Sequence, residues 1–238
     1  MELTATSVDV RLPATLSQGS LAVLAADLGL AFASPIPVVC LRGATDEVFC
    51  QGLSLDADAV EHPDVEAFAA LLGTLIDAPK PTVAVIDGQA LGGGLGLAAA
   101  CDWVMASKRS TFGLPELLWG LLPAIIWPVV ASRMSTRAAL AWVLHAQSRP
   151  AEAALAAGLV DELTGERPDH DVRRRVRART RLDPGALADL RRWARASASL
   201  PVAAALAQGA VITGARLQTP AVRARLHAFN RGEAPWQS

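Results

Sequence analysis

Two apolar runs that each end in a glycine constrain the fold of this chain most strongly. The segments IPVVCLRG (36–43) and PTVAVIDG (81–88) are almost continuously apolar, which is typical of strands buried on both faces of a sheet. Further strands are expected at 7–13 and 102–107. Segments with helical spacing separate these strands, at 20–33, at 64–79 and after the glycines 92–94. This alternation predicts right-handed crossovers and a largely parallel sheet, so the expected fold class is α/β.

The composition excludes several classes of protein. The chain has 238 residues, of which 52% are hydrophobic and 19% charged, enough to bury a core and too apolar for a disordered protein. A formal net charge of -1 gives no global field that would attract nucleic acid or an anionic membrane. The first 13 residues lack a basic start followed by an apolar core, so no signal peptide is expected. The segment AIIWPVVA (124–131) is too short to span a bilayer.

The three cysteines, Cys40, Cys50 and Cys101, are widely spaced in apolar surroundings. They form no CxxC pair and no metal-ligand spacing. We therefore expect three buried reduced thiols, no metal site and a cytoplasmic protein.

The pattern becomes helical from about residue 131. A short helix ending at Gly158 is expected before a strand-like segment at 159–163, and the charged segment 168–182 is expected to form a solvated helix. Further helical segments are expected at 135–146, 183–197 and 200–230. The sequence therefore predicts an α/β core over 1–165 and a helical C-terminal region over 166–238.

Three consecutive glycines, Gly92 to Gly94, open an apolar helix in GQALGGGLGLAAACD. A glycine-rich turn at a helix entrance leaves N–H groups free at the positive end of the helix dipole, where they can hold a phosphate or an oxyanion. The segment lacks the GxxxxGK[ST] pattern of a P-loop, and its glycines fit a dinucleotide-binding fingerprint poorly. Close packing of the helix on a strand is the alternative explanation.

A second turn and a carboxylate complete the chemistry-bearing segments. In EVFCQGLSLDA (47–57), Gly52 permits close backbone approach, so the two turns could each offer an N–H to one oxygen, as in an oxyanion hole. Glu116 stands in the apolar segment STFGLPELLWGLLPA (110–124), where burial should raise its pKa and suit it to proton transfer near neutrality. Helix capping beside Pro115 is the alternative role for Glu116.

Together, FCQG, GQALGGGLGLAAACD and FGLPELLWGLLP resemble the crotonase (enoyl-CoA hydratase/isomerase) superfamily, and the resemblance extends from about residue 37 to 163 and more loosely to the C-terminus. It implies a spiral of ββα units with a helical C-terminal region for oligomerisation or active-site cover, assembled as a homotrimer or hexamer. It implies a thioester substrate, carried by CoA or by the phosphopantetheine of an acyl carrier protein, and no other cofactor. By position, the N–H groups of Leu53 and Gly93 form the oxyanion hole and Glu116 is the acid/base.

The resemblance also marks a departure and further substrate contacts. Typical hydratases of this superfamily carry a second glutamate two residues after the glycine triplet, and this chain has Gly96 there. That puts chemistry based on two carboxylates in doubt. Gly52, Gly92 and Gly94 carry over as substrate-binding backbone, and Ser54 and His62 are weaker candidates for substrate contact.

The segments LPELLWGLLPAIIWPVVASRM, RPAEAALAAGLVDEL and DVRRRVRARTRLDPGALADLRRWAR are similar to the dehydratases of polyketide β-branching cassettes. This similarity implies dehydration of 3-hydroxy-3-methylglutaryl-ACP to 3-methylglutaconyl-ACP. That subgroup often has an aspartate where this chain has Ser54. Two alternatives stay open: a single-glutamate enoyl isomerase or a decarboxylase, and a non-catalytic scaffold that binds acyl-ACP.

Other residues have simpler expected roles. His145, His170 and His227 are dispersed and are expected at the surface or in the core rather than in catalysis. Lys80 is a candidate for binding a substrate carboxylate, although a solvated lysine before a strand is the simpler interpretation. The tryptophans Trp119, Trp127 and Trp142 are expected in the core or between subunits. The basic run 173–181 could face an acidic carrier protein or be an exposed helix face paired with Asp169 and Asp171.

Overall fold

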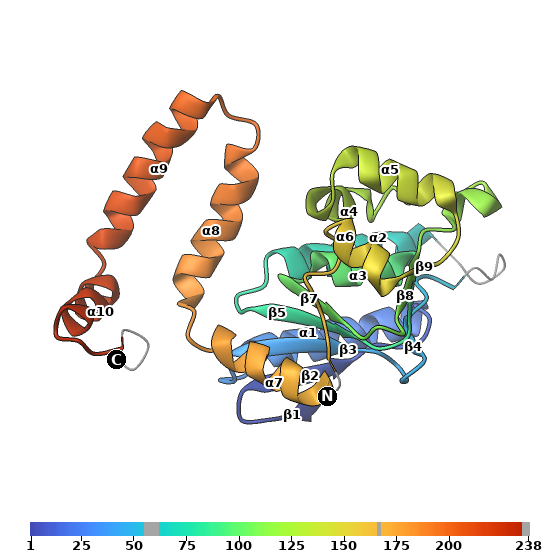
Figure 1. Cartoon of the computed structure of the whole chain (residues 1–238), viewed down its shortest axis with the longest axis horizontal. Helices are drawn as coiled ribbons and strands as arrows, with labels where there is room; N and C mark the ends of the chain where they lie inside the picture. Colours follow the sequence, from blue (N-terminus) through green and yellow to red (C-terminus); the bar gives the residue numbers. More distant parts are fainter. Residues whose placement is uncertain (55–61, 166–167, 235–238) are drawn as a thin grey trace. The chain divides into compact units, whose positions relative to one another are not determined.

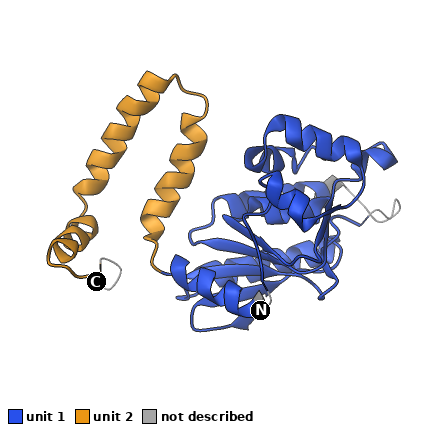
Figure 2. Cartoon of the chain, viewed as in Figure 1, with its two compact units in different colours: residues 1–180 blue, residues 181–238 orange. Residues whose placement is uncertain are grey.

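A computed structural model describes residues 1–54, 62–165 and 168–234. It divides into two compact units, 1–180 and 181–238 (Figure 2). The strands are β1 (Glu2–Leu3), β2 (Ser7–Arg11), β3 (Val38–Arg42), β4 (Val48–Cys50), β5 (Thr82–Ile86), β6 (Gln89–Leu91), β7 (Trp103–Ala106), β8 (Thr111–Gly113), β9 (Arg149–Pro150) and β10 (Glu162–Leu163). The helices of the first unit are α1 (Gln18–Ala33), α2 (His62–Ile76), α3 (Gly93–Ala100), the 3-10 turn η1 (Glu116–Trp119), α4 (Trp127–Arg133), α5 (Thr136–His145), α6 (Ala151–Ala156) and α7 (Pro168–Arg179).

The larger sheet has six strands in the order β1-β2-β3-β5-β7-β10 (Figure 1). All its pairings are parallel except that of β1 with β2. The central strands are the glycine-terminated apolar runs, and their side chains are buried on both faces, as at the successive residues Cys40 and Leu41 of β3. The expected α/β fold with a largely parallel sheet is confirmed.

A second, smaller sheet joins β4, β6, β8 and β9. Strands β4, β6 and β8 are parallel, and each follows a strand of the larger sheet along the chain. A large-sheet strand, a small-sheet strand and a helix therefore repeat as β3-β4-α2 and β5-β6-α3, which are the expected ββα units. The sequence pattern indicates only turns where this sheet lies, because strands of three residues are too short to show alternation.

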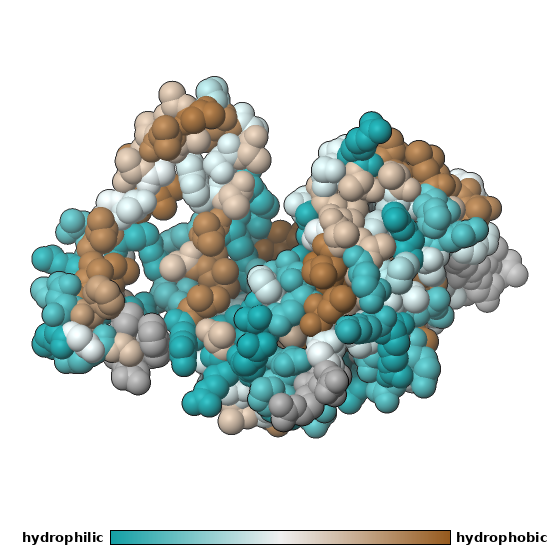
Figure 3. All heavy atoms as spheres, viewed as in Figure 1, coloured by the Kyte–Doolittle hydropathy of each residue, from teal (hydrophilic) through white to brown (hydrophobic). Residues whose placement is uncertain are grey.

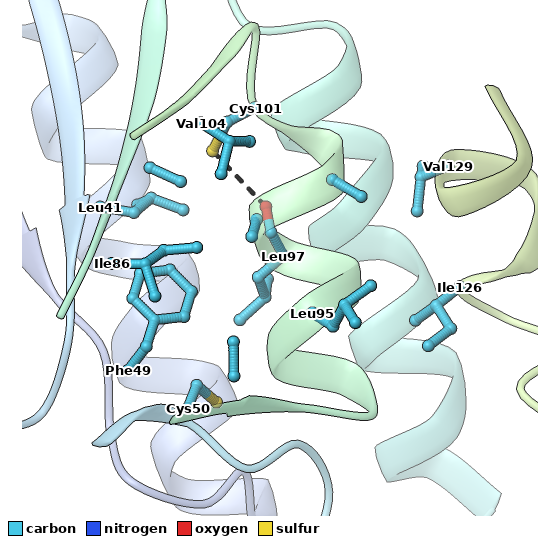
Figure 4. Close-up of a cluster of buried hydrophobic side chains, with 14 of the residues drawn as sticks. Leu41, Phe49, Cys50, Ile86, Leu95, Leu97, Cys101, Val104, Ile126 and Val129 are labelled. Atoms are coloured by element: carbon cyan, nitrogen blue, oxygen red, sulfur yellow. Dashed lines mark hydrogen bonds between the residues drawn. The ribbon is translucent and has the colours of Figure 1, made fainter. Parts of the chain in front are cut away.

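The main hydrophobic core lies between the larger sheet and helices α1, α2 and α3. Figure 4 shows its centre, where Leu41, Ile86 and Val104 of the sheet meet Leu97 of α3. A smaller cluster on the opposite face joins Cys40 and Met105 to Val172 and Val176 of α7. The expectation that α7 is a solvated helix is therefore wrong for one of its faces, because both valines are 2% exposed.

All three cysteines are free and buried, as predicted. Burial raises the pKa of Cys40 and Cys101 to about 12 and that of Cys50 to about 11, so the thiols stay protonated near neutral pH. In the described part of the chain, no group of three or more His, Cys, Asp or Glu residues could hold a metal ion. None of the helices described is long and apolar enough to cross a membrane.

The second unit consists of α8 (Pro184–Ser197), α9 (Val202–Leu217) and α10 (Pro220–Asn230). Asp183 ties these helices together through Arg225 and Arg216, the latter at 2.6 Å. These guanidinium groups, with the Ala186 amide, lower the pKa of Asp183 to about 2. Large apolar side chains remain exposed along these helices (Figure 3), including Leu190, Leu206 and Val211. The first compact unit ends at residue 180 and includes α7, whereas the sequence predicts that the helical region starts at residue 166.

Lys80, which lies just before β5, binds the backbone at the C-terminal end of α1. Its Nζ donates hydrogen bonds to the carbonyl oxygens of Ala31, at 3.2 Å, of Ile36, at 2.9 Å, and of Ser34. An ammonium group is favourable there, because the last carbonyls of a helix lack helical partners and carry the negative end of its dipole. This role of Lys80 differs from the contact with a substrate carboxylate for which its sequence position makes it a candidate.

We predict that Lys80→Met lowers the free energy of unfolding by about 1–3 kcal/mol, because it removes charge-assisted hydrogen bonds while keeping the apolar stem. Urea denaturation measures the change. Lys108 is the only other lysine and is exposed, so Lys108→Met is the matched control and should shift stability by less than about 0.5 kcal/mol. Equal effects of the two substitutions would contradict a structural role for Lys80.

Candidate active site

The first part of the site is the backbone that follows β4. Leu53 forms an isolated parallel bridge with Leu16. In this bridge the Leu16 amide donates to the Gly52 carbonyl at 2.8 Å, and the Ser54 amide donates to the Leu16 carbonyl at 2.9 Å. Because successive amides of an extended chain point to opposite sides, the Leu53 N–H points away from this bridge.

The second part is the start of α3. Gly93 is the first residue of this helix, so its N–H has no acceptor within the helix and lies at the positive end of the dipole. The preceding residue, Gly92, donates its own N–H to the Gly113 carbonyl at 3.0 Å. Neither the Leu53 N–H nor the Gly93 N–H donates to another backbone group in the described residues.

These two backbone segments touch each other. A Cβ on Gly52 would lie 2.5 Å from the Gly93 nitrogen, closer than a real side chain permits, and 3.1 Å from the Gly93 Cα. Gly52 also has φ +86°, a left-handed conformation that favours glycine. The peptide unit that carries the Leu53 N–H therefore packs against the start of α3. Two such neighbouring amides can serve as donors to a single oxygen atom.

Sheet pairing brings the third part, Glu116, to the same place. Strands β6 and β8 are parallel with Leu91 opposite Gly113, so the segments after both strands leave the same edge of the small sheet. The chain after β6 becomes Gly92 and α3, and the chain after β8 becomes η1, which begins at Glu116. Glu116 Oε1 lies 3.1 Å from where a Cβ on Gly92 would stand, so Gly92 leaves room for the carboxylate.

The Glu116 carboxyl group is poorly solvated. Its Oε2 is buried and has no hydrogen-bond partner among the residues that the structure describes. Burial raises the pKa of Glu116, and a hydrogen bond to its own backbone only partly opposes that effect. A carboxyl group in this state holds its proton to a higher pH than an ordinary glutamate, which suits it to proton transfer.

The other glycines of the triplet face protein rather than the carboxylate. A Cβ on Gly94 would lie 1.9 Å from the Cys50 carbonyl oxygen, so close packing of α3 on β4 already accounts for this glycine. A Cβ on Gly93 would lie 3.0 Å from Cζ of Phe68, a residue of α2 that is 1% exposed. Sequence reasoning did not single out Phe68, because nothing distinguishes it from the other apolar residues of its helix.

The structure places the remaining candidates as follows. Ser54 is half-buried beside the Leu53 amide, and its own amide is used by Leu16. His62 begins α2, and its side chain lies outside the described residues. His145, His170 and His227 are all exposed, as expected for residues without a catalytic role.

The tryptophans differ from one another. Trp142 is 1% exposed and belongs to the core, as predicted. Trp119, expected in the core or between subunits, is 56% exposed in this chain. Trp119 ends η1. Like Leu118 and Leu122, it is a large apolar residue that is exposed in the segment directly after Glu116.

Comparison with known proteins agrees with this geometry. The model of the enoyl-CoA hydratase/isomerase family matches residues 22–238. A carnitinyl-CoA dehydratase from Proteus mirabilis is 41% identical over 90 residues, covering 36% of this chain and 34% of that protein. A mitochondrial methylglutaconyl-CoA hydratase from Rattus norvegicus is 36% identical over 93 residues, covering 37% of this chain and 30% of that protein. The chain thus spans about a third of the length of these curated relatives.

A solved structure resembles the whole chain. Pseudomonas aeruginosa AtuE matches this chain with a TM-score of 0.87 and 27% sequence identity, and the match covers 100% of this chain and 98% of that one. The family match covers both amide-bearing turns, the Glu116 segment and the α/β unit from residue 22 onward. This chain is a member of the enoyl-CoA hydratase/isomerase family and has its crotonase fold.

Proposed function

We propose that this protein is a dehydratase that removes water from a 3-hydroxyacyl thioester. The observation that supports this proposal best is the position of the Glu116 carboxyl group beside Gly92, one residue before the free N–H of Gly93. A proton-transfer group and an anion-stabilising site are thus adjacent, as the formation and collapse of an enolate require.

In this proposal the thioester carbonyl oxygen accepts hydrogen bonds from the N–H groups of Leu53 and Gly93. Glu116 takes the proton from Cα, and the electron pair moves onto the carbonyl oxygen to give an enolate. The two amides and the dipole of α3 stabilise this charge more than they stabilise the neutral carbonyl. The enolate then forms the Cα–Cβ double bond and expels the β-hydroxyl, which leaves as water with the proton from Glu116.

The finer substrate proposal is 3-hydroxy-3-methylglutaryl-ACP, which would give 3-methylglutaconyl-ACP in polyketide β-branching. One relative is a methylglutaconyl-CoA hydratase, so its name contains the acyl group that this reaction would form. On α7, Arg173 and Arg177 are exposed one helical turn apart and could face an acidic carrier protein. The neighbouring Arg175 instead pairs with Glu162.

We also propose that the protein acts as a homotrimer or hexamer. The second unit exposes Leu206 (71%), Val211 (72%) and Val202 (76%). Soluble monomers rarely expose contiguous apolar patches of large size, so contact with another copy would remove this surface from water.

The substrate proposal is tested by intact-mass analysis of 3-hydroxy-3-methylglutaryl-ACP and of its CoA analogue after incubation with the enzyme. We predict the loss of one water. Further loss of carbon dioxide would add a decarboxylase activity. An unchanged mass with both substrates would contradict the proposed reaction and favour the isomerase or scaffold alternative.

The role of Glu116 is tested by Glu116→Gln. We predict that this variant loses at least about 100-fold in kcat, because a positioned acid/base contributes roughly that much or more. Its Tm at pH 8 should equal or exceed that of the wild type. The raised pKa means that folding favours the protonated form, so stability falls as pH rises through the pKa of folded Glu116, and the neutral amide avoids this loss.

Glu152, an exposed glutamate of α6, provides the matched control. Glu152→Gln should leave both kcat and Tm unchanged. Turnover of Glu116→Gln near the wild-type rate would exclude Glu116 as the proton-transfer group.

A further inference from the structure

In helix α3, the space that a side chain at Gly96 would fill is occupied by a residue from another helix segment. A Cβ on Gly96 would lie 2.2 Å from Cγ2 of Ile126 and 2.8 Å from its Cβ. Contacts this short never occur between real side chains, so Ile126 occupies the space that belongs to a side chain at position 96. Figure 4 shows Ile126 reaching towards α3 beside Leu95.

Position 96 lies close to the catalytic carboxyl group. The Gly96 amide donates to the Gly92 carbonyl at 3.1 Å, so the two residues are about one helical turn apart, about 6 Å along the axis. Helical side chains lean towards the helix N-terminus and cover the preceding turn. A side chain at position 96 would therefore lean towards Gly92, which faces Glu116 Oε1.

Ile126 cannot move aside easily, because it is buried and the other end of α4 is fastened to the end of α3. Ile126 is 3% exposed and is the N-cap residue directly before α4, where its carbonyl oxygen accepts a hydrogen bond from the Val130 amide at 3.0 Å. At the other end, Arg133 donates to the Ala99 carbonyl at 2.9 Å and to the Cys101 carbonyl. The methyl groups of Ile126 are thus a fixed part of the wall beside the start of α3.

We propose that Ile126 is a specificity-determining residue that takes the place of a side chain at position 96 and so restricts the site to one proton-transfer group, Glu116. Ile126 acts through the surroundings of Glu116 and is a positioning residue rather than a catalytic one. The effect on proton transfer rests on the proposed function. The statement that Ile126 fills the space beside Gly96 rests only on the short distances between the two residues.

The proposal has a chemical consequence. An isoleucine at this place offers neither a carboxylate to accept a proton nor a donor to hold water. The proton that Glu116 takes from Cα therefore has no second side chain at position 96 to receive it, and Glu116 itself returns it to the leaving hydroxyl. The unpartnered Oε2 of Glu116 agrees with an apolar surrounding.

The contact is tested first by thermal unfolding of Gly96→Ala, Ile126→Gly and the double variant. Alanine is normally better than glycine inside a helix, but at position 96 it must displace Ile126. We expect Gly96→Ala to lower Tm and the double variant to lose less than the sum of the single losses. The pair Gly96→Ala with Ile126→Ala should recover less, because the alanine keeps the Cβ that lies 2.8 Å away.

Gly73 in α2 is the matched control, because a Cβ there would meet nothing within 4 Å. Gly73→Ala should leave Tm unchanged or raise it. If Gly96→Ala behaves like Gly73→Ala, or if its effect adds to that of Ile126→Gly without coupling, Ile126 does not occupy position 96 and the proposal is wrong.

The influence on Glu116 is tested by comparing Gly96→Glu/Ile126→Gly with Gly96→Gln/Ile126→Gly. The two double variants have side chains of equal size and differ only in charge. A second carboxylate should raise the pKa of Glu116 by about one unit relative to the glutamine variant. Carbon NMR of labelled glutamate reports this pKa without turnover, with the Glu116 signal assigned by its loss in Glu116→Gln.

The acid limb of the kcat/KM profile should move to higher pH by the same amount. Equal Glu116 titrations in the two double variants would overturn the proposal, since position 96 would then not face the carboxyl group. If the NMR shift occurs and the enzyme dehydrates no thioester, the placement of position 96 holds and the proposed function fails.

Discussion

The contact between the backbones at Gly52 and Gly93 is the constraint on which the site depends. The turn after β4 approaches the first residue of α3 so closely that neither position tolerates a side chain without displacement. This contact sets the Leu53 N–H beside the N–H at the start of the helix. It needs the ββα arrangement, because β4 and β6 must pair in the small sheet before their following turns can meet.

The small sheet also determines the electrostatics of the site. Pairing of β6 with β8 places the Glu116 carboxyl group against Gly92, where it loses solvent without gaining a cationic partner in the described part of the chain. Desolvation raises its pKa. Backbone donors that are fixed before the substrate arrives need no reorganisation when charge develops, so a neutral site of this kind can stabilise an enolate without a charged side chain.

The sequence contains enough information to predict the large sheet and the three chemistry-bearing segments. Long apolar runs such as β3 and β5 have strong patterns, and glycine triplets at a helix entrance have a clear physical use. The small sheet was not predictable in this way, since its strands have only two or three residues. The buried face of α7 was missed because the arginines around Val172 and Val176 hide a stripe of only two apolar residues.

Contacts between distant segments escaped sequence reasoning for a different reason. The sequence shows that Gly96 stands where related hydratases have a glutamate. Nothing in the sequence indicates that Ile126, thirty positions later, fills the space beside Gly96. Phe68 beneath Gly93 is likewise one apolar helix residue among many. Such pairs become visible only when the packing of α3 against α2 and α4 is known.

The central claim is that the Leu53 and Gly93 amides bind a thioester carbonyl beside Glu116. Infrared difference spectroscopy tests it most directly, with a carbonyl-labelled 3-hydroxyacyl thioester bound to the Glu116→Gln variant, which should hold the substrate without turning it over. Two fixed amide donors in a desolvated site should polarise the carbonyl more than water does, so its stretching band should move to lower wavenumber than in solution. A band at the solution position, or above it, would contradict the account.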